Sequence, residues 1–254
     1  MANLPNFLVG NSNKEEKGDK SLIEVFFTKS LMKQLYYHAM RVDIEDNNEK
    51  AELVLELLGP SFIELGTGTN RIAVLKNGFV CKIALDYRGL VDNFTEYKRS
   101  IELPHVFTKV YECNMLIVIC EYVNVMDRSI YIENKEGILA LLSELSEHYI
   151  FNDCGYNLKN YYNMGYRDNE EIVILDYGYM YPIKGNEQVL SCPKCKSLLK
   201  YNTTFTKFEC SNCKTYYTIM EVTRRMRTDL EDYENKTILK LNNCTMPNFD
   251  SIEI

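Results

Sequence analysis

The sequence predicts an α+β protein with a small metal-binding module near its C-terminal end. Apolar residues recur at helical spacing over 22–40 and 136–149, which predicts helices. Apolar runs on both sides of Asn77-Gly78, and again over 106–122, predict antiparallel strands. Two Cys-x-x-Cys pairs, separated by fourteen residues, predict the metal site.

Length and composition fit a globular protein with a substantial core. The chain has 254 residues, of which 46% are apolar, enough for one large domain or two small ones. It contains no run of eighteen apolar residues, and its first residues lack the basic and apolar regions of a signal peptide. We therefore expect a cytoplasmic protein with no membrane partner. The five cysteines outside the pairs are scattered, as reduced thiols are: Cys81, Cys113, Cys120, Cys154 and Cys244.

The net charge of −7 is unevenly distributed. Residues 191–227 contain eight Lys or Arg and two Glu, a balance of +6, so the remainder carries −13. This asymmetry separates a basic module from an acidic body. The acidic body is a poor candidate for binding nucleic acid, whereas the basic module is a candidate.

The N-terminal part of the chain predicts helices. Ser21 begins a capping-box pattern at the start of the helix predicted over 22–40. A polar stretch at 44–50 predicts a linker, and a second helix over 51–58 is expected to end at Gly59. The predicted divisions of the chain are an N-terminal helical segment (1–58), a core (59–190), the metal module (191–218), and a C-terminal helix with a tail (219–254).

The stretch from Glu64 to Lys82 suggests a nucleotide site. Asn77-Gly78 between alternating apolar runs is a strong hairpin signal. Gly66-x-Gly68 precedes the first run, and a backbone without side chains can approach a phosphate there. Lys82 places an ammonium group in an apolar strand, where a charge normally has a partner.

The elements that follow have a definite predicted order. The run Met-Leu-Ile-Val-Ile-Cys at 115–120 is apolar throughout, so its strand is expected to be buried on both faces. The order is a turn at 86–90, a helix at 91–101 carrying Glu96, strands at 106–113 and 115–122, a helix at 136–149, and a hairpin at 165–175 that ends at Asp176-Tyr177-Gly178.

This order resembles that of the protein-kinase-like superfamily. The resemblance spans about residues 59–182 and is greatest to the short kinase-like proteins of bacteriophages, which implies a host-cell cytoplasm. It implies a two-lobe fold with a truncated C-lobe, because only about seventy residues follow Asp-Tyr-Gly and no Ala-Pro-Glu segment occurs among them. The truncation favours a kinase-like adaptor or a small-molecule enzyme over a conventional protein kinase.

The resemblance implies that ATP and Mg²⁺ bind in a cleft between the lobes. The amides around Gly66 and Gly68 would lie over the phosphates, Lys82 would neutralise the α- and β-phosphates, and Glu96 would hold Lys82 in place.

The same resemblance assigns residues further along the chain. Backbone groups of Glu121 and Val123 would bond the adenine edge in the connector between lobes. Asn163 and Asp176 would hold Mg²⁺, and Tyr177 takes the place of the usual Phe, with its packing role kept.

The sequence departs from the family pattern at the position of the catalytic aspartate. Its position, five before Asn163, is occupied by Leu158, which cannot accept a proton or orient a hydroxyl. The nearest upstream acid is Asp153, ten before Asn163, within Phe151-Asn152-Asp153. Either the loop carries an insertion and Asp153 is the base of an active kinase, or the base is missing and the protein is a pseudokinase with impaired phosphotransfer.

The four paired cysteines predict a zinc ribbon. Two facing Cys-x-x-Cys knuckles give a closed, tetrahedral and therefore structural Cys₄ site, with zinc as the expected metal: Cys192, Cys195, Cys210 and Cys213. A pair of redox dithiols is the alternative, but no thioredoxin-like pattern surrounds either pair.

The basic and aromatic composition of this module leaves two interpretations open. The aromatic residues pack the ribbon and the lysines solvate it, or the ribbon contacts single-stranded nucleic acid, a polymerase or another protein. The second interpretation makes the chain a non-enzymatic binding protein.

Overall fold

The computed structural model of the chain describes residues 20–41, 43–151, 161–178, 180–184, 190–202, 207–218 and 221–222. Within these residues the chain forms two compact units, unit 1 (20–101 and 109–122) and unit 2 (102–108 and 123–222). Residues 1–19 of the predicted N-terminal segment lie outside the described residues, as does the predicted C-terminal helix apart from Glu221 and Val222. None of the helices in the described part combines the length and the apolarity needed to cross a membrane.

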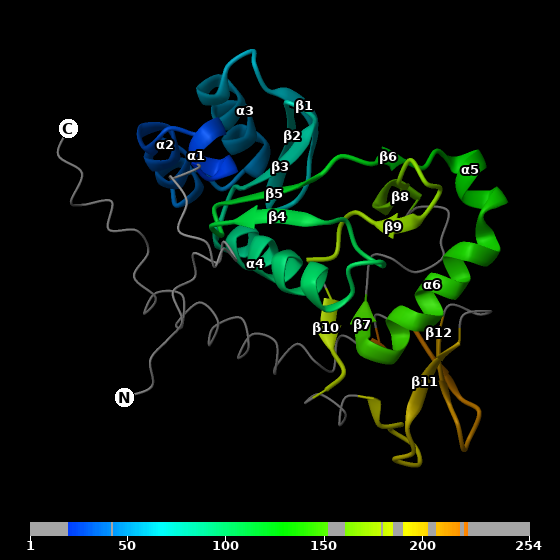
Figure 1. Ribbon diagram of the computed structural model, residues 1–254. Coiled ribbons are helices and arrows are strands. Elements are labelled where there is room, and N and C mark those ends of the chain that lie inside the picture. Colours follow the sequence, from blue (N-terminus) through cyan, green and yellow to red (C-terminus); the bar gives the residue numbers. More distant parts are fainter. Residues whose placement is uncertain are drawn as a thin grey trace, which may run out of the picture. The chain divides into compact units, whose positions relative to one another are not determined.

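Unit 1 is built on an antiparallel sheet of five strands in the order β1-β2-β3-β5-β4 (Figure 1). The strands are β1 (Ile63–Thr67), β2 (Arg71–Lys76), β3 (Phe79–Ala84), β4 (Val110–Cys113) and β5 (Ile117–Glu121). The predicted hairpin is confirmed, with Asn77 at φ 50° and Gly78 at φ 83° in the turn between β2 and β3. The predicted burial of the strand at 115–122 is also confirmed, because β5 is buried along all but its final residue.

Three helices precede the sheet, α1 (Leu22–Phe26), α2 (Lys29–Ala39) and α3 (Asn47–Leu58). The prediction of one helix over 22–40 is wrong, because the Thr28 hydroxyl accepts from the Leu31 amide and starts a new helix. The linker predicted at 44–50 is wrong in its second half, since Asp46 caps α3 at Asn47. The capping role of Ser21 and the stop at Gly59, with φ 68°, are confirmed.

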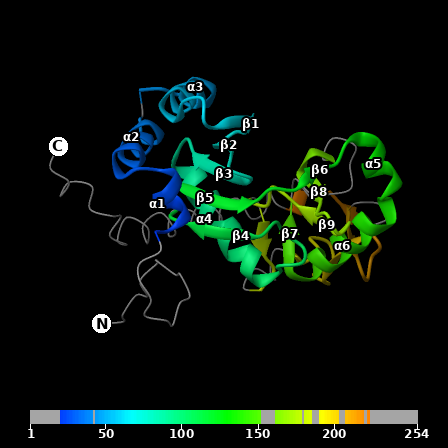
Figure 2. The ribbon, with the colours of Figure 1, turned by 45° about the horizontal axis from the view of Figure 1, so that its top comes forward.

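The two faces of this sheet differ in chemistry. Helices α1–α3 lie beside the sheet (Figure 2). Cross-strand neighbours Ile72 and Ile83, and Val74 and Cys81, share the apolar core with these helices. The alternate side chains point to the opposite face, against helix α4 (Tyr87–Glu102). The turn predicted at 86–90 is wrong, because Asp86 accepts from the Gly89 amide and α4 begins at Tyr87.

Apart from the cysteine module, the described part of unit 2 contains two small sheets and two α-helices. Its elements are β6 (Asn124–Val125), α5 (Arg128–Glu133), α6 (Lys135–His148), β7 (Tyr149–Phe151), η1 (Tyr161–Asn163), β8 (Met164–Tyr166), β9 (Ile172–Ile174) and β10 (Met180–Pro182). The predicted helix at 136–149 and the predicted hairpin at 165–175 are confirmed as α6 and β8–β9. The strand predicted from residue 106 begins only at Val110, because Val106 instead bonds Ile174 within unit 2.

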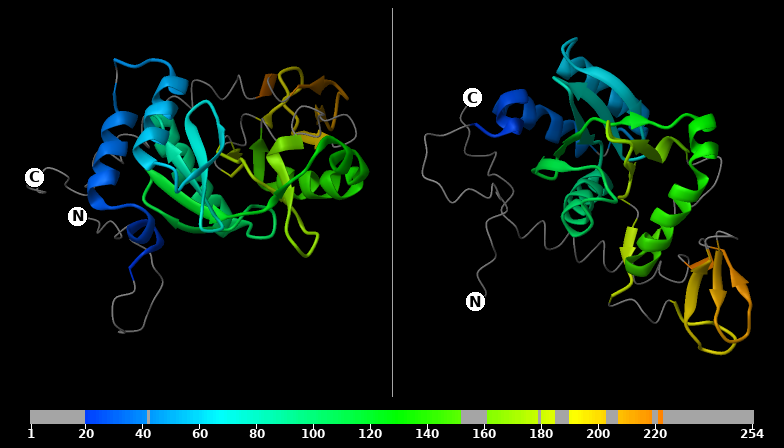
Figure 3. Two further views of the ribbon diagram at one scale, coloured as in Figure 1. Left: turned by 90° about the horizontal axis from the view of Figure 1, so that it is seen from above. Right: turned by 45° about the vertical axis from the view of Figure 1, so that its right-hand side comes forward.

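The cysteine module of unit 2 is a three-stranded sheet of β11 (Leu199–Asn202), β12 (Lys207–Cys210) and β13 (Tyr216–Tyr217) (Figure 3). Its core is continuous with the strand β7, since Ile150 is buried in the same cluster as Phe208. The ring of Phe151 meets that of Tyr201 at a centroid distance of 4.9 Å. The module therefore packs on the rest of unit 2.

Replacing Gly89 by Ala is expected to destabilise unit 1. A Cβ at this position would lie 2.3 Å from the Asn70 carbonyl oxygen and 2.9 Å from Ala84 Cα, both backbone atoms. We expect a loss of about 1–3 kcal/mol in thermal or urea unfolding, although Ala is the better helix former. Gly68→Ala is the control, because its nearest neighbour lies at 3.5 Å. A Gly89→Ala protein as stable as the parent would contradict this packing.

Candidate functional site

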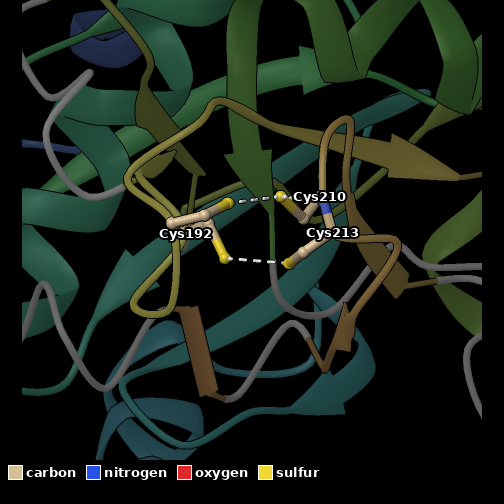
Figure 4. A group of neighbouring side chains, drawn as sticks. Cys192, Cys210 and Cys213 are labelled. Atoms are coloured by element: carbon tan, nitrogen blue, oxygen red, sulfur yellow. Dashed lines mark hydrogen bonds between the residues drawn. The ribbon is translucent and has the colours of Figure 1, made fainter.

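Four cysteines of the ribbon form a cluster that could hold a metal ion. The sulfurs of Cys192, Cys195, Cys210 and Cys213 all lie within 4.8 Å of one another. The sulfur of Cys192 is 3.6 Å from that of Cys213, and the sulfur of Cys195 is 3.3 Å from that of Cys210 (Figure 4). Zinc–sulfur bonds of about 2.3 Å in a tetrahedron place sulfurs about 3.8 Å apart, so the four residues fit such a metal.

The two knuckles have the same backbone geometry. The Cys192 amide donates to the Ser197 carbonyl at 2.8 Å, and the Cys210 amide donates to the Thr215 carbonyl at 2.9 Å. Each Cys-x-x-Cys is followed by a lysine in the left-handed region, Lys196 at φ 62° and Lys214 at φ 56°. The repeat Cys-x-x-Cys-Lys-Ser/Thr is the sequence signal of this shared turn.

Hydrogen bonds and burial act on the thiols in opposite directions. Burial opposes ionisation of Cys192, but bonds from the Tyr217 hydroxyl and from the amides of Cys195 and Lys194 lower its pKa to about 6. Burial raises the pKa of Cys210 to about 11. A metal ion binds thiolates and displaces the remaining protons, so the cluster would bind it in a pH-dependent manner.

Unit 1 carries a buried ionic cluster on the α4 face of the sheet. The Lys82 ammonium lies 2.9 and 2.8 Å from the two carboxylate oxygens of Glu96, as the resemblance implies. Nη2 of Arg71 lies 2.8 Å from Oε1 of the same carboxylate. Glu96 is fully buried, and the Arg71 and Lys82 side chains are 10% and 13% exposed. Two strands thus present cations to one carboxylate of the helix.

Further polar contacts fix α4 on the sheet. The Asn93 amide nitrogen lies 2.7 Å from the Met115 carbonyl and 3.1 Å from the Leu116 carbonyl, just before β5. Asn70, in the turn after β1, donates to the Asp92 carboxylate at 3.0 Å. The inner face of α4 is therefore held largely by directional hydrogen bonds, which define its position more narrowly than apolar contacts would.

The glycine turn lies between β1 and β2. Gly66 lies inside β1, and the Gly68 amide donates to the Arg71 carbonyl at 2.8 Å. Among the described residues, a Cβ on Gly66 would meet no atom within 4 Å, and one on Gly68 would make only an ordinary contact at 3.5 Å. The packing of the described residues thus does not require either glycine.

The connector residues lie at the junction of the units. The chain passes from unit 1 to unit 2 between Tyr122 and Val123. The Glu121 amide donates to the Lys109 carbonyl at 2.9 Å, and its side chain accepts from the Lys109 amide at 2.7 Å. The amide and the carboxylate of Glu121 are thus both bonded to the backbone of Lys109.

In unit 2, Asn163 and Asp176 lie at the same end of the β8–β9 hairpin. Met164 pairs with Ile174, and one step further the Leu175 amide donates to the Asn163 carbonyl at 2.9 Å. Asn163 is buried and Asp176, the next residue after Leu175, is exposed. The backbone of Asn163 thus pairs with the residue that precedes Asp176.

Tyr177 has the packing role predicted for it. It is 1% exposed, and its ring stacks on Phe107 at a centroid distance of 4.3 Å. Its hydroxyl donates to the Thr108 carbonyl at 2.9 Å, so the extra oxygen relative to Phe is satisfied.

Asp153 and Leu158 lie outside the described residues. Arg71 and Asn93 were not predicted, although Arg71 is a charge in an apolar strand, the same signal that marked Lys82.

No protein-family model and no curated protein matches the sequence.

Removing one ribbon cysteine is expected to abolish metal binding and to destabilise unit 2. Cys210→Ser should reduce bound metal from one ion per chain to none, measured by elemental analysis. The melting temperature should fall by roughly 4–8 °C, for a loss of about 2 kcal/mol in a chain of this size. Cys81→Ala is the control, since Cys81 lies in the unit 1 core and should leave the metal content unchanged. Retention of the metal by Cys210→Ser would exclude the Cys₄ site.

Proposed function

We propose that the chain is a kinase-like protein that binds ATP with Mg²⁺ and has atypical or impaired phosphotransfer. The observation that carries this proposal is the ion pair between Lys82 of β3 and Glu96 of α4. In protein kinases the phosphate-binding lysine lies on the third strand, pairs with a glutamate of the following helix, and is preceded by a glycine-rich loop. Unit 1 has these elements in this order.

The glycine turn supports phosphate binding. Because the described residues leave room for a side chain at Gly66 and Gly68, another reason is needed for two glycines at this turn. Close approach of a phosphate to backbone amides supplies such a reason, since a Cβ would shield them. Lys82 would then neutralise the phosphate oxygens while Glu96 holds its ammonium in place.

The β8–β9 hairpin supports a magnesium site. Asn163 and Asp176, at the same end of this hairpin, carry an amide oxygen and a carboxylate, which are ligands that Mg²⁺ accepts, with water and phosphate oxygens completing its shell. When bound, the metal would neutralise charge on the phosphates. Glu121 and Val123, on either side of the passage between the units, would contact the adenine edge.

We assign a structural zinc ion to the ribbon. Four sulfur donors leave no open position for substrate, which is the donor set of a structural zinc site. The ribbon core is small and continues into Ile150 of β7, so the metal would supply folding free energy that the module alone lacks.

The alternative of a nucleic-acid-binding or polymerase-binding ribbon has weaker support. Five exposed lysines favour it: Lys194, Lys196, Lys200, Lys207 and Lys214. The aromatic side chains are mostly engaged elsewhere, because Phe208 is buried and Tyr201 packs between Phe151 and Phe208. In the described part of the ribbon, Tyr216 is the exposed aromatic residue. A single exposed ring is a poor platform for stacking successive bases.

Mg-ATP is expected to raise the melting temperature of the protein. A ligand at one hundred times its Kd stabilises by about 2.7 kcal/mol, or roughly 5–10 °C for a chain of this size. Lys82→Met and Asp176→Ala should each abolish the shift. Lys98→Met is the control, because Lys98 is exposed on α4 and should leave the shift unchanged. An unchanged melting temperature at millimolar Mg-ATP would reject nucleotide binding.

Phosphate transfer from γ-labelled ATP is expected to be weak. A missing general base costs about 10²–10⁴-fold in rate, and Leu158 occupies the family position of that base. Efficient transfer that disappears in Asp153→Asn would instead identify an active kinase using Asp153. Asp168→Asn, in the exposed β8–β9 turn, is the matched control. Transfer that survives Asp153→Asn would remove Asp153 from the role of base.

A further inference from the structure

Arg71 occupies an unusual position in the glycine turn. The kinase pattern Gly-x-Gly-x-x-Gly would place a third glycine here, and the chain has Gly66-x-Gly68-x-x-Arg71. Arg71 is the first residue of β2, and its carbonyl closes the turn by accepting from the Gly68 amide at 2.8 Å. Its backbone therefore belongs to the turn while its side chain reaches α4.

The Arg71 side chain joins two successive turns of α4. Its Nη2 lies 2.8 Å from Oε1 of Glu96, and its Nη1 lies 3.4 Å from Oδ1 of Asn93. These helix residues are three positions apart, so they are neighbours on one face. A planar guanidinium can bond both at once, which the single ammonium of a lysine cannot do with the same geometry.

Both cations meet the same oxygen atom. Nζ of Lys82 lies 2.9 Å from Oε1 of Glu96, the atom that Arg71 also contacts. A fully buried carboxylate requires a cation close to it, because water cannot replace a lost partner. If Lys82 were the sole partner, drawing its ammonium toward a phosphate would weaken the compensation of Glu96.

We propose that Arg71 is a positioning residue that keeps Glu96 and α4 in place while Lys82 shares its ammonium with a nucleotide phosphate. Arg71 acts through Glu96, and the phosphate contact belongs to Lys82. This inference rests on the proposed nucleotide site. It predicts that Arg71 affects the phosphate-dependent part of nucleotide affinity and leaves the adenosine part unchanged.

The test compares Mg-ATP and adenosine binding by calorimetry in the full-length protein. Arg71→Met should weaken Mg-ATP binding by at least about tenfold and change adenosine binding by less than about twofold. Arg71→Lys keeps the positive charge but loses the planar guanidinium that bonds two partners at once. An intermediate loss of about threefold in Mg-ATP affinity is therefore expected. Arg88→Met is the control, because Arg88 is exposed on α4. This variant should bind Mg-ATP as the parent protein does.

The outcomes separate this inference from the proposed function. A parent protein that binds no Mg-ATP removes the nucleotide site, and the role of Arg71 with it. A parent that binds Mg-ATP while Arg71→Met and Arg71→Lys bind it equally well overturns the role of Arg71 alone. Equal losses for Mg-ATP and adenosine would also overturn it, because they indicate general damage to the unit. If Arg71→Met does not fold, the ratio of the two affinities in Arg71→Lys decides.

Discussion

The carboxylate of Glu96 is the constraint on which the arrangement of unit 1 depends. It is fully buried and bonds Lys82 of β3 and Arg71 of β2. A buried charge is tolerated only with such partners, so the helix α4 has to lie where both cations reach it. The opposite face of the sheet obeys a different rule, because helices α1–α3 cover it through apolar packing. The face covered by α1–α3 thus buries apolar side chains. The face covered by α4 holds the Lys82 ammonium in a defined orientation.

In unit 2 the corresponding constraints are a strand register and a cysteine cluster. The register of β8 and β9 brings Asn163 next to Leu175, and so sets the separation of Asn163 and Asp176 along the hairpin. The ribbon depends on four sulfurs whose mutual distances suit a tetrahedral metal. Because Ile150 belongs to the ribbon core, a metal ion bound there would also stabilise the strand β7, and through it the β7–β10 ladder.

Local chemistry explains which elements could be predicted. The hairpin at Asn77-Gly78 and the cysteine cluster have signals within a few residues of the atoms involved, and both are present. The break at Thr28 and the early start of α4 at Tyr87 depend on single side-chain caps that apolar periodicity does not register. The shortened strand β4 is a tertiary effect, because the Val106 carbonyl accepts from the amide of Ile174, far along the chain.

The cluster around Glu96 shows the limit of the same reasoning. A charge in an apolar strand signals a partner, and that rule applies to Arg71 as well as to Lys82. The rule does not identify the partner, since the register of β2 and β3 and the placement of α4 decide which carboxylate is reached. Arg71 is compatible with the turn because its backbone is already extended in β2, and its side chain points to the helix face. Arg71 therefore adds a second cation beside the carboxylate that binds Lys82.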